Sequence, residues 1–209
     1  MSLSAVNIPE GFVDLQDLMP DLVVALAYYS DDNFVGERID GYEANRALLS
    51  RPAAEAVQKV QAALAAFGLG LKILDAYRPQ QAVDHFLRWA RQDGHEQGRE
   101  RFYPGLDKAT LFREGYVATH SSHTRGSTVD LTIIDLATGQ ELDMGSEFDF
   151  FSTVSWPEYL DLTPNQRANR LLLQNLMLEQ GFLPFAQEWW HFTLANEPWP
   201  DTWFDFPIR

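Results

Sequence analysis

The sequence predicts a single α+β domain in which a central, mainly antiparallel sheet is flanked by helices. Segments with helical and with strand periodicity are mixed along the chain, without the regular strand–helix–strand alternation of a parallel sheet. No internal repeat or low-complexity linker divides the 209 residues, and ~150 residues is a usual domain length. Hydrophobic residues make up 45% of the chain, which is an ordinary globular content. We therefore expect one folded domain over residues 1–209.

Three segments have the periodicity and the boundary residues of helices. The first spans residues 50–68, from a serine cap with proline in the first turn to a glycine stop. The second starts at Pro79 and carries apolar residues at positions 83, 86, 87 and 90. The third spans residues 163–181, from a Thr-Pro start to a glycine stop.

Four segments are predicted as strands: residues 71–76, 116–119, 128–134 and 183–194. The third is the clearest, because Val129, Leu131 and Ile133 alternate with polar residues. Asp130, in the middle of this strand, then lies on the opposite face, toward water or toward a polar site. Two segments are predicted to be loop-rich or irregular: residues 1–48 and 93–110.

Charge and composition exclude several classes of function. Acidic residues outnumber basic ones by 30 to 16, which gives a formal net charge of −14. Such a surface repels phosphate backbones and anionic lipids, so we expect neither a nucleic-acid partner nor a membrane partner. The chain has no cysteine, which excludes disulfides, thiolate metal sites and cysteine nucleophiles.

The start of the chain predicts a cytoplasmic protein. No apolar stretch approaches the ~20 residues that a transmembrane helix needs. The first basic residue is Arg38, so the positively charged start of a secretory signal is missing. A periplasmic location follows instead if a signal was removed ahead of residue 1.

The first candidate site segment holds His123 and Asp130, which are seven residues apart and separated by a turn at Gly126. Imidazole nitrogen and carboxylate oxygen are ligands that a tetrahedral zinc site accepts. The alternative is a loop histidine beside a solvated strand face, and spacing alone leaves it open.

The second candidate segment holds Glu188 and His191. Zinc hydrolases use a carboxylate to take the proton of the attacking water, and these residues could be such a base and a ligand. Residues three apart on a regular strand point to opposite faces. Both can therefore serve one site only if Glu188 lies at a bend, a bulge or the strand entrance. The alternative is an aromatic core strand with a glutamate at its edge.

The third candidate segment holds Arg78, where a predicted strand ends and a predicted helix begins. A fixed guanidinium can stabilise the oxyanion that forms when water attacks a carbonyl. The alternative is a surface ion pair with Asp75, which contributes little. Three further histidines fit structural or surface roles and are not expected to bind metal: His85, His95 and His120.

The order and spacing of short motifs along the chain are those of a known family. The main motif is Ser121-x-His123-x-x-Gly126-x-Thr128-x-Asp130 followed by Glu188-x-x-His191. Further motifs extend over nearly the whole chain: Asp32-Asn33-Phe34-Val35-Gly36, Gly41-Tyr42-Glu43-x-Asn45-Arg46, Asp75-x-Tyr77-Arg78-Pro79, Met144-Gly145-x-x-Phe148-Asp149 and Phe204-Asp205-Phe206-Pro207. The set resembles the zinc-dependent D-alanyl-D-alanine dipeptidases, most closely the vancomycin-resistance type, whose relatives are D,D-carboxypeptidases. One departure is Thr128, which stands where that family usually has alanine.

The resemblance implies a role for each matching residue. His123, Asp130 and His191 would bind one Zn²⁺ ion per chain. Glu188 would be the general base and acid, and Arg78 would stabilise the tetrahedral intermediate. Four residues would lie near the bound dipeptide: Asp149, Asp75, Ser121 and Tyr28. The implied fold is that of the D-Ala-D-Ala peptidase and hedgehog-like domains, an antiparallel sheet flanked by helices.

The leading functional hypothesis is hydrolysis of the small dipeptide D-Ala-D-Ala to two D-alanines, with Asp149 pairing with the substrate ammonium group. The second hypothesis is a D,D- or L,D-carboxypeptidase or endopeptidase acting on cell-wall peptides, which would need an open cleft. The third is a zinc-stabilised binding module without turnover. A homodimer stays open as the oligomeric state.

Overall fold

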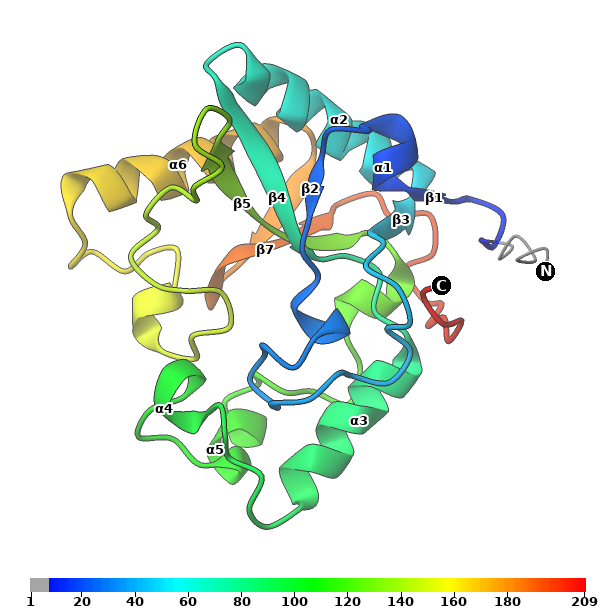
Figure 1. Ribbon diagram of the computed structural model, residues 1–209, viewed down its shortest axis with the longest axis vertical. Coiled ribbons are helices and arrows are strands. Elements are labelled where there is room, and N and C mark those ends of the chain that lie inside the picture. The colour runs from blue at the N-terminus through cyan, green and yellow to red at the C-terminus, as the bar shows by residue number, and fades with distance from the viewer. Residues whose placement is uncertain (1–7) are drawn as a thin grey trace.

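A five-stranded sheet with strand order β2-β4-β5-β7-β6 forms the centre of the structure (Figure 1). The computed structural model describes residues 8–209, so residues 1–7 of the expected domain lie outside the described residues. The strands are β2 (Val23–Val24), β4 (Leu69–Asp75), β5 (Thr128–Asp135), β7 (Glu188–Leu194) and β6 (Phe182–Phe185). β2 and β4 are parallel, whereas the other three pairings are antiparallel. The predicted α+β class with a mainly antiparallel sheet is confirmed.

The helices α2 to α6 lie at two ends of the molecule. The helices α2 (Arg51–Ala65) and α6 (Pro164–Glu179) pack against the sheet and against each other. The helices α3 (Gln80–Arg91), α4 (Arg99–Phe102) and α5 (Lys108–Arg113) gather at the opposite end (Figure 1). Six short elements complete the described chain: β1 (Phe12–Asp14), α1 (Leu15–Leu18), β3 (Leu48–Ser50) and the 3-10 turns η1 (Ala27–Tyr29), η2 (Ser122–Arg125) and η3 (Thr153–Ser155). Of these, β1 and β3 form a separate two-stranded sheet.

The three predicted helices form close to their expected boundaries. Ser50 is the cap residue of α2, but its Oγ lies 2.7 Å from Ser127 Oγ and makes no hydrogen bond to the helix. At the start of α6, the Thr163 side chain accepts from the Gln166 N–H and the Gln166 side chain accepts from the Thr163 N–H. This reciprocal capping explains why the helix begins there.

Several predictions of secondary structure were wrong. Residues 116–119 form a loop and no strand. The predicted strand 183–194 is a hairpin of β6 and β7, because the chain turns at Ala186 and Gln187. Neither residue is a typical turn former, so the sequence carries no local signal for this turn. Residues 93–110, predicted to be irregular, contain α4 and the start of α5, whereas the described part of residues 1–48 is loop-rich as predicted, with only the short elements β1, α1, β2 and η1 and the start of β3.

Strand β5 is buried on both faces. Its apolar face contributes Val129, Leu131 and Ile133 to the core, as the alternation predicts. The polar residue Asp130 on the other face is only 2% exposed, so this face is turned toward a polar site and not toward water.

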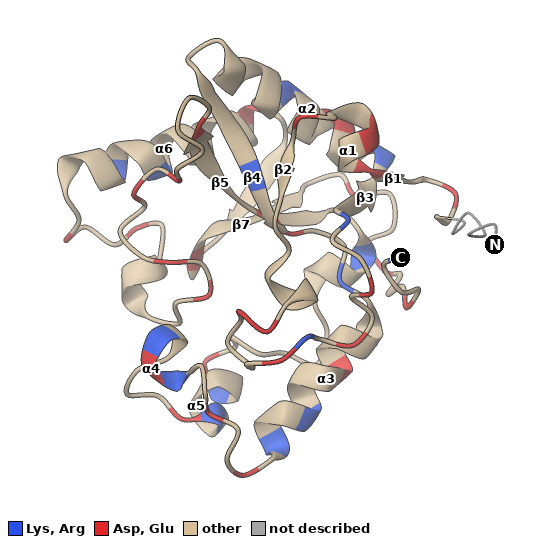
Figure 2. Ribbon diagram, viewed as in Figure 1, with Lys and Arg blue, Asp and Glu red and all other residues tan. Residues whose placement is uncertain are grey.

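Basic residues are frequent on α3, α4 and α5 (Figure 2). Arg88 and Arg101 pair with Asp40, Asp32 and Glu147, which lie on neighbouring loops. These surface ion pairs connect the helices to the loops around them. Within residues 8–209, no helix has both the length and the apolar character needed to cross a membrane.

Gly126 lets the ring of Phe12 approach the backbone of the η2 turn more closely than a residue with a side chain would permit. Its φ of +81° lies in the left-handed region, and a Cβ atom there would collide with the ring of Phe12. That ring is fixed by stacking on Trp199 and by edge contacts with Phe204 and Phe206.

We predict that Gly126→Ala lowers the free energy of unfolding by roughly 2–4 kcal/mol, because backbone strain and overpacking add. The control is Gly139→Ala, where φ is +71° but no heavy atom lies within 4 Å of the added Cβ. This control should cost only ~1 kcal/mol from strain. Denaturant unfolding of both variants measures the two costs, and equal values would contradict the packing argument.

Candidate metal centre and active site

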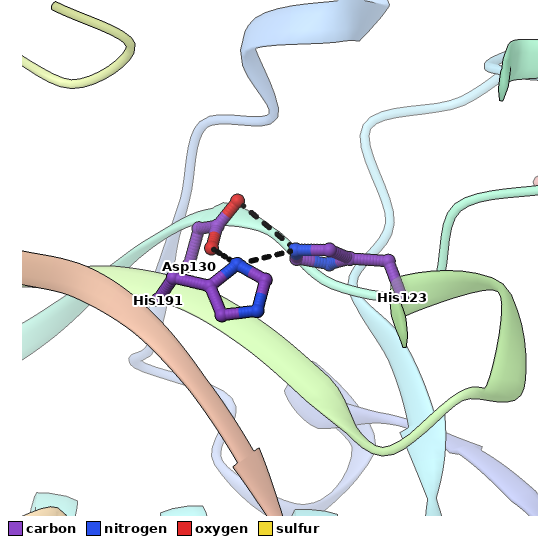
Figure 3. Close-up of side chains that lie close together, drawn as sticks. All are labelled: His123, Asp130 and His191. Carbon is purple, nitrogen blue, oxygen red and sulfur yellow. Dashed lines mark hydrogen bonds and ion pairs between the residues drawn. The ribbon is translucent and has the colours of Figure 1, made fainter. Parts of the chain in front are cut away.

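Three potential metal ligands meet at one end of the sheet (Figure 3). His123 Nε2 lies 3.2 Å from Asp130 Oδ2 and 3.3 Å from His191 Nδ1. His191 Nδ1 lies 3.1 Å from Asp130 Oδ1. Among residues 8–209, this is the only cluster of His, Asp and Glu side chains close enough to share one metal ion. His85, His95 and His120 lie outside this cluster.

The sheet register brings the site residues into one row. Asp130 on β5 lies directly opposite His191 on β7 and, on its other side, opposite Asp75 on β4. A β-bulge between Ile73 and Asp75 produces the second pairing, because it adds one residue to β4. His123 reaches the row from the 3-10 turn η2.

The donor atoms fit a zinc ion. Nitrogen and oxygen ligands at ~2.0–2.1 Å in a tetrahedral arrangement lie ~3.3–3.4 Å from one another, close to the separations in this cluster. His123 Nδ1 donates to the carbonyl of Ala76 at 2.7 Å, which leaves Nε2, the nitrogen that faces the other potential ligands, for a metal. His191 Nε2 lies 3.3 Å from Ser122 Oγ, which leaves Nδ1 for a metal. Asp130 Oδ1 is buried and lies 3.1 Å from His191 Nδ1, so both atoms could bind one cation.

Electrostatics within the cluster favour an ionised carboxylate. Burial opposes the charge on Asp130, but His123 and His191 outweigh it and hold its pKa well below the usual range. Burial also opposes the imidazolium form of His191, but the carboxylates of Asp130 and Glu188 raise its pKa to about 9. A metal ion binding at this site must therefore displace a proton from His191.

Glu188 meets the condition that the sequence imposed on it. It is the first residue of β7, and the β6–β7 register shifts between Pro184 and Phe185, opposite the part of β7 that carries Glu188 and His191. Its Oε2 consequently lies 3.4 Å from His191 Nδ1, although the two residues are three apart on one strand. The structure thus brings a carboxylate beside the three potential ligands.

Arg78 is held from behind by a buried carboxylate. Its Nε and Nη2 lie 2.9 Å and 2.8 Å from Asp75 Oδ2, and Nη2 lies 3.7 Å from Asp130 Oδ2. Tyr42 donates to the other oxygen of Asp75 at 2.7 Å. The Arg78 side chain is 13% exposed and that of Asp75 is fully buried, so the alternative of a surface ion pair does not hold. The sequence did not predict that Tyr42 would support Asp75. Its place in the motif Gly41-Tyr42-Glu43-x-Asn45-Arg46 was the one indication of a role.

Two aromatic rings, which pack edge-to-face against each other, lie beside the same guanidinium. The Cζ atom of Arg78 lies 4.9 Å from the ring centre of Tyr28 and 5.4 Å from that of Phe86. Aromatic faces attract a cation and restrict its rotation. The orientation of Arg78 is therefore fixed by Asp75 and by both rings.

Asp149 and Tyr28 form a second buried polar pair. The Tyr28 hydroxyl donates to Asp149 Oδ2 at 2.8 Å, and Asp149 is only 4% exposed. The φ of Asp149 is +58°, which is uncommon for a residue other than glycine. Burial is the main cause that raises the pKa of Asp149 well above its usual range, while the Tyr28 hydrogen bond opposes this shift.

A cavity of about 420 Å³ contains these groups. Its wall includes all three potential ligands, Glu188 and Arg78, and also three of the four predicted substrate contacts: Tyr28, Ser121 and Asp149. Ser121 Oγ also accepts from the His123 N–H at 3.3 Å and so caps the turn that carries this potential ligand. Asp75 is not part of the wall, because it lies behind Arg78.

A cluster of nitrogen and oxygen donors beside a carboxylate and a guanidinium is typical of metal-dependent hydrolases. The chain belongs to the family described as D-ala-D-ala dipeptidase, whose family model matches residues 9–209. It is therefore a peptidase.

Curated relatives match almost the whole chain. A D-alanyl-D-alanine dipeptidase of Enterococcus faecalis is 41% identical over 95% of this chain and 98% of the relative. A protein of the same name from Streptomyces coelicolor is 42% identical over 95% and 97%. One from Escherichia coli is 35% identical over 88% and 84%.

Two solved structures show a weaker likeness, at 15% identity. One is the vancomycin-resistance D,D-pentapeptidase VanY, as a mutant in complex with Zn(II), with a TM-score of 0.44 over 74% of this chain and 77% of that one. The other is VanYB in complex with D-alanine-D-alanine, with a TM-score of 0.45 over 74% and 76%.

We predict that Asp149→Asn raises the Tm of the chelator-treated protein at pH 7. The folded pKa of Asp149 lies above the unfolded value of ~3.9, so the folded state retains a proton that the unfolded state releases. Stability is then lost as the pH rises above ~4, whereas a neutral asparagine avoids this loss and still accepts from Tyr28.

Thermal unfolding between pH 4 and pH 8 tests this prediction. The gain in Tm should shrink toward pH 4, where aspartic acid is protonated in both states. The same substitution at the exposed Asp161 is the matched control and should not reproduce the pattern. A lower Tm for Asp149→Asn than for the wild type at pH 7 would contradict the expected stabilisation.

Proposed function

We propose that this protein is a zinc-dependent dipeptidase that hydrolyses D-Ala-D-Ala to two D-alanines. The observation that carries the proposal is the convergence of a His-Asp-His donor set, a carboxylate and a guanidinium in one cavity. Relatives named D-alanyl-D-alanine dipeptidase, about as long as this chain and up to 42% identical to it, support the choice of substrate.

His123, Asp130 and His191 would hold one zinc ion per chain. Three protein ligands leave a fourth position for water or substrate. When bound, zinc supplies a hydroxide nucleophile at neutral pH and polarises the peptide carbonyl. Nitrogen and oxygen donors without sulfur suit this catalytic type of site.

Glu188 is the proposed general base and acid. Its carboxylate takes a proton from the attacking water while the new carbon–oxygen bond forms. It then gives this proton to the nitrogen as the carbon–nitrogen bond breaks, so that the second alanine leaves as an amine. The position of Glu188 at the cavity wall, 3.4 Å from His191, supports this role.

Arg78 is the proposed stabiliser of the oxyanion. Asp75 occupies its Nε and Nη2 groups, so the remaining N–H donors of the guanidinium are available to the cavity. A donor fixed before the reaction strengthens its bond as negative charge develops on the carbonyl oxygen. We assign Asp75 to the support of Arg78 in place of direct substrate binding, because it lies behind the cavity wall.

Asp149 is the proposed partner of the substrate ammonium group. A carboxylate in a nearly closed environment gains most from a cation that enters with the substrate. Tyr28 orients it, and Ser121 lines the same cavity. This arrangement favours a dipeptidase over a carboxypeptidase, whose substrate continues on the amino side. The presence of both Glu188 and Arg78 argues against a binding module without turnover.

We predict different outcomes for ligand and base substitutions. His123→Ala should lose both zinc and activity, because it removes a ligand. Glu188→Gln should retain its zinc and its fold but lose about 10²–10⁴-fold in kcat, because a general base is removed. Elemental analysis and steady-state kinetics measure both properties.

The matched control is His85→Ala, because His85 is a histidine outside the metal cluster, paired with Glu37 and Asp40. It should keep zinc and activity. Loss of zinc from Glu188→Gln would show that Glu188 is a ligand, and retention of zinc in His123→Ala would refute the proposed metal site.

We predict that N-acetylation of D-Ala-D-Ala lowers kcat/KM by about 10²–10³-fold. Acetylation removes the ammonium charge and leaves Asp149 without its partner, and loss of one member of a buried pair costs ~3–5 kcal/mol. Equal values for both dipeptides, or a preference for the acetylated one, would favour the carboxypeptidase alternative.

A further inference from the structure

Arg170 on α6 is a buried guanidinium whose partners are backbone carbonyls. It is 5% exposed, and its Nε donates to the Met144 carbonyl at 2.6 Å. Its Nη1 donates to the Trp156 carbonyl at 3.0 Å, and its Nη2 to the Val154 carbonyl at 2.9 Å. These three carbonyls come from both ends of the segment 144–156, so one side chain closes this segment into a loop.

The same loop contains a chain of hydrogen bonds whose direction is fixed. Ser155 Oγ donates its proton to the Phe150 carbonyl at 2.6 Å, so it must accept from Ser146 Oγ at 2.9 Å. Ser146 has then used its own proton and accepts from Trp189 Nε1 at 2.9 Å and from Arg170 Nη2 at 3.5 Å. The chain thus runs from Arg170 and Trp189 to the carbonyl of Phe150.

Both ends of this series of hydrogen bonds are at sequence neighbours of residues in the proposed active site. Phe150 follows Asp149, which has the left-handed φ of +58°. A non-glycine residue keeps such a conformation only where its surroundings impose it. Trp189 follows Glu188, and the Arg170 guanidinium lies 5.9 Å from the Trp189 ring centre. The Asp149 loop and the Glu188 strand are therefore joined through Ser146.

Among residues 8–209, no carboxylate forms an ion pair with the buried guanidinium of Arg170. Burial lowers the pKa of Arg170 to about 10, although the nearby charge of Asp143 opposes this shift, so the charged form is disfavoured there. An apolar residue at this position would extend the buried stripe of α6 that contains Leu173 and Met177. The guanidinium fork is matched to carbonyls that a compact ammonium cannot reach together.

We propose that Arg170 is a positioning residue that holds Asp149 in place and thereby sets the preference for substrates with a free amino terminus. The inference rests on the proposed function, in which Asp149 receives the ammonium group. Arg170 itself touches neither substrate nor metal, because it lies outside the cavity wall.

The test compares Arg170→Lys with Arg167→Lys, the same substitution at an exposed position of the same helix. In zinc-loaded protein, kcat/KM is measured for D-Ala-D-Ala and for its N-acetylated form. Arg170→Lys should lower the value for the free dipeptide by about 10–100-fold, mainly through KM, because displaced binding groups lose their alignment. The value for the acetylated dipeptide should not change, and Arg167→Lys should behave as wild type.

Two results would overturn the inference. One is an unchanged ratio of the two kcat/KM values in Arg170→Lys. The other is a parallel loss for both dipeptides, which would indicate a general structural role. If Arg170→Lys does not fold, Ser146→Ala replaces it, because this change interrupts the hydrogen-bond chain and leaves Arg170 in place. The same outcomes then decide.

Hydrogen exchange supplies a readout that does not depend on activity. Amide exchange in residues 144–156 should accelerate in Arg170→Lys and not in Arg167→Lys, and unchanged exchange there would refute the role of Arg170. Wild-type discrimination between the dipeptides tests the proposed function separately. If the wild type has equal kcat/KM for the free and the acetylated dipeptide, the proposed function is refuted. The proposed effect of Arg170 on substrate preference is then refuted as well, whatever the result of hydrogen exchange.

Discussion

A row of three side chains across neighbouring strands is the constraint on which the site depends. Asp75, Asp130 and His191 lie opposite one another on β4, β5 and β7. Two buried carboxylates in one row would repel each other unless positive groups accompanied them. Arg78 lies between them, and His123 approaches Asp130 from η2. The elements around the row are arranged so that each buried negative charge has a partner.

Local irregularities of the backbone bring further groups of the proposed active site to the row of Asp75, Asp130 and His191. The bulge in β4 brings Asp75 opposite Asp130, and the register shift between β6 and β7 allows Glu188 and His191 to share one site. On the facing wall, Asp149 has an unfavourable backbone conformation and a buried carboxylate. Such features cost ~1–3 kcal/mol each and persist where the surrounding structure imposes them. The site therefore depends on local strain that the rest of the fold compensates.

The sequence by itself determined the fold class, the three long helices and the strand that carries Asp130. Alternation of polar and apolar residues reports burial along one strand, and caps such as Thr163 mark helix ends, so these features are local. The candidate ligands were predicted through the resemblance to a known family, because the spacing of His123, Asp130 and His191 alone left their role open. The condition that Glu188 must lie at a strand entrance followed from strand geometry alone.

Only the tertiary structure decided how these segments meet. The hairpin between β6 and β7 turns at Ala186 and Gln187, which have no turn preference, so long-range pairing with β5 imposes it. Asp75 came from the sequence as a substrate contact, but the bulge in β4 turns it behind Arg78. The proposed positioning role of Arg170 depends on hydrogen bonds to carbonyls at both ends of the segment 144–156, which is distant in the sequence. Register and loop closure are set by contacts between segments far apart in the chain, and a local pattern does not record them.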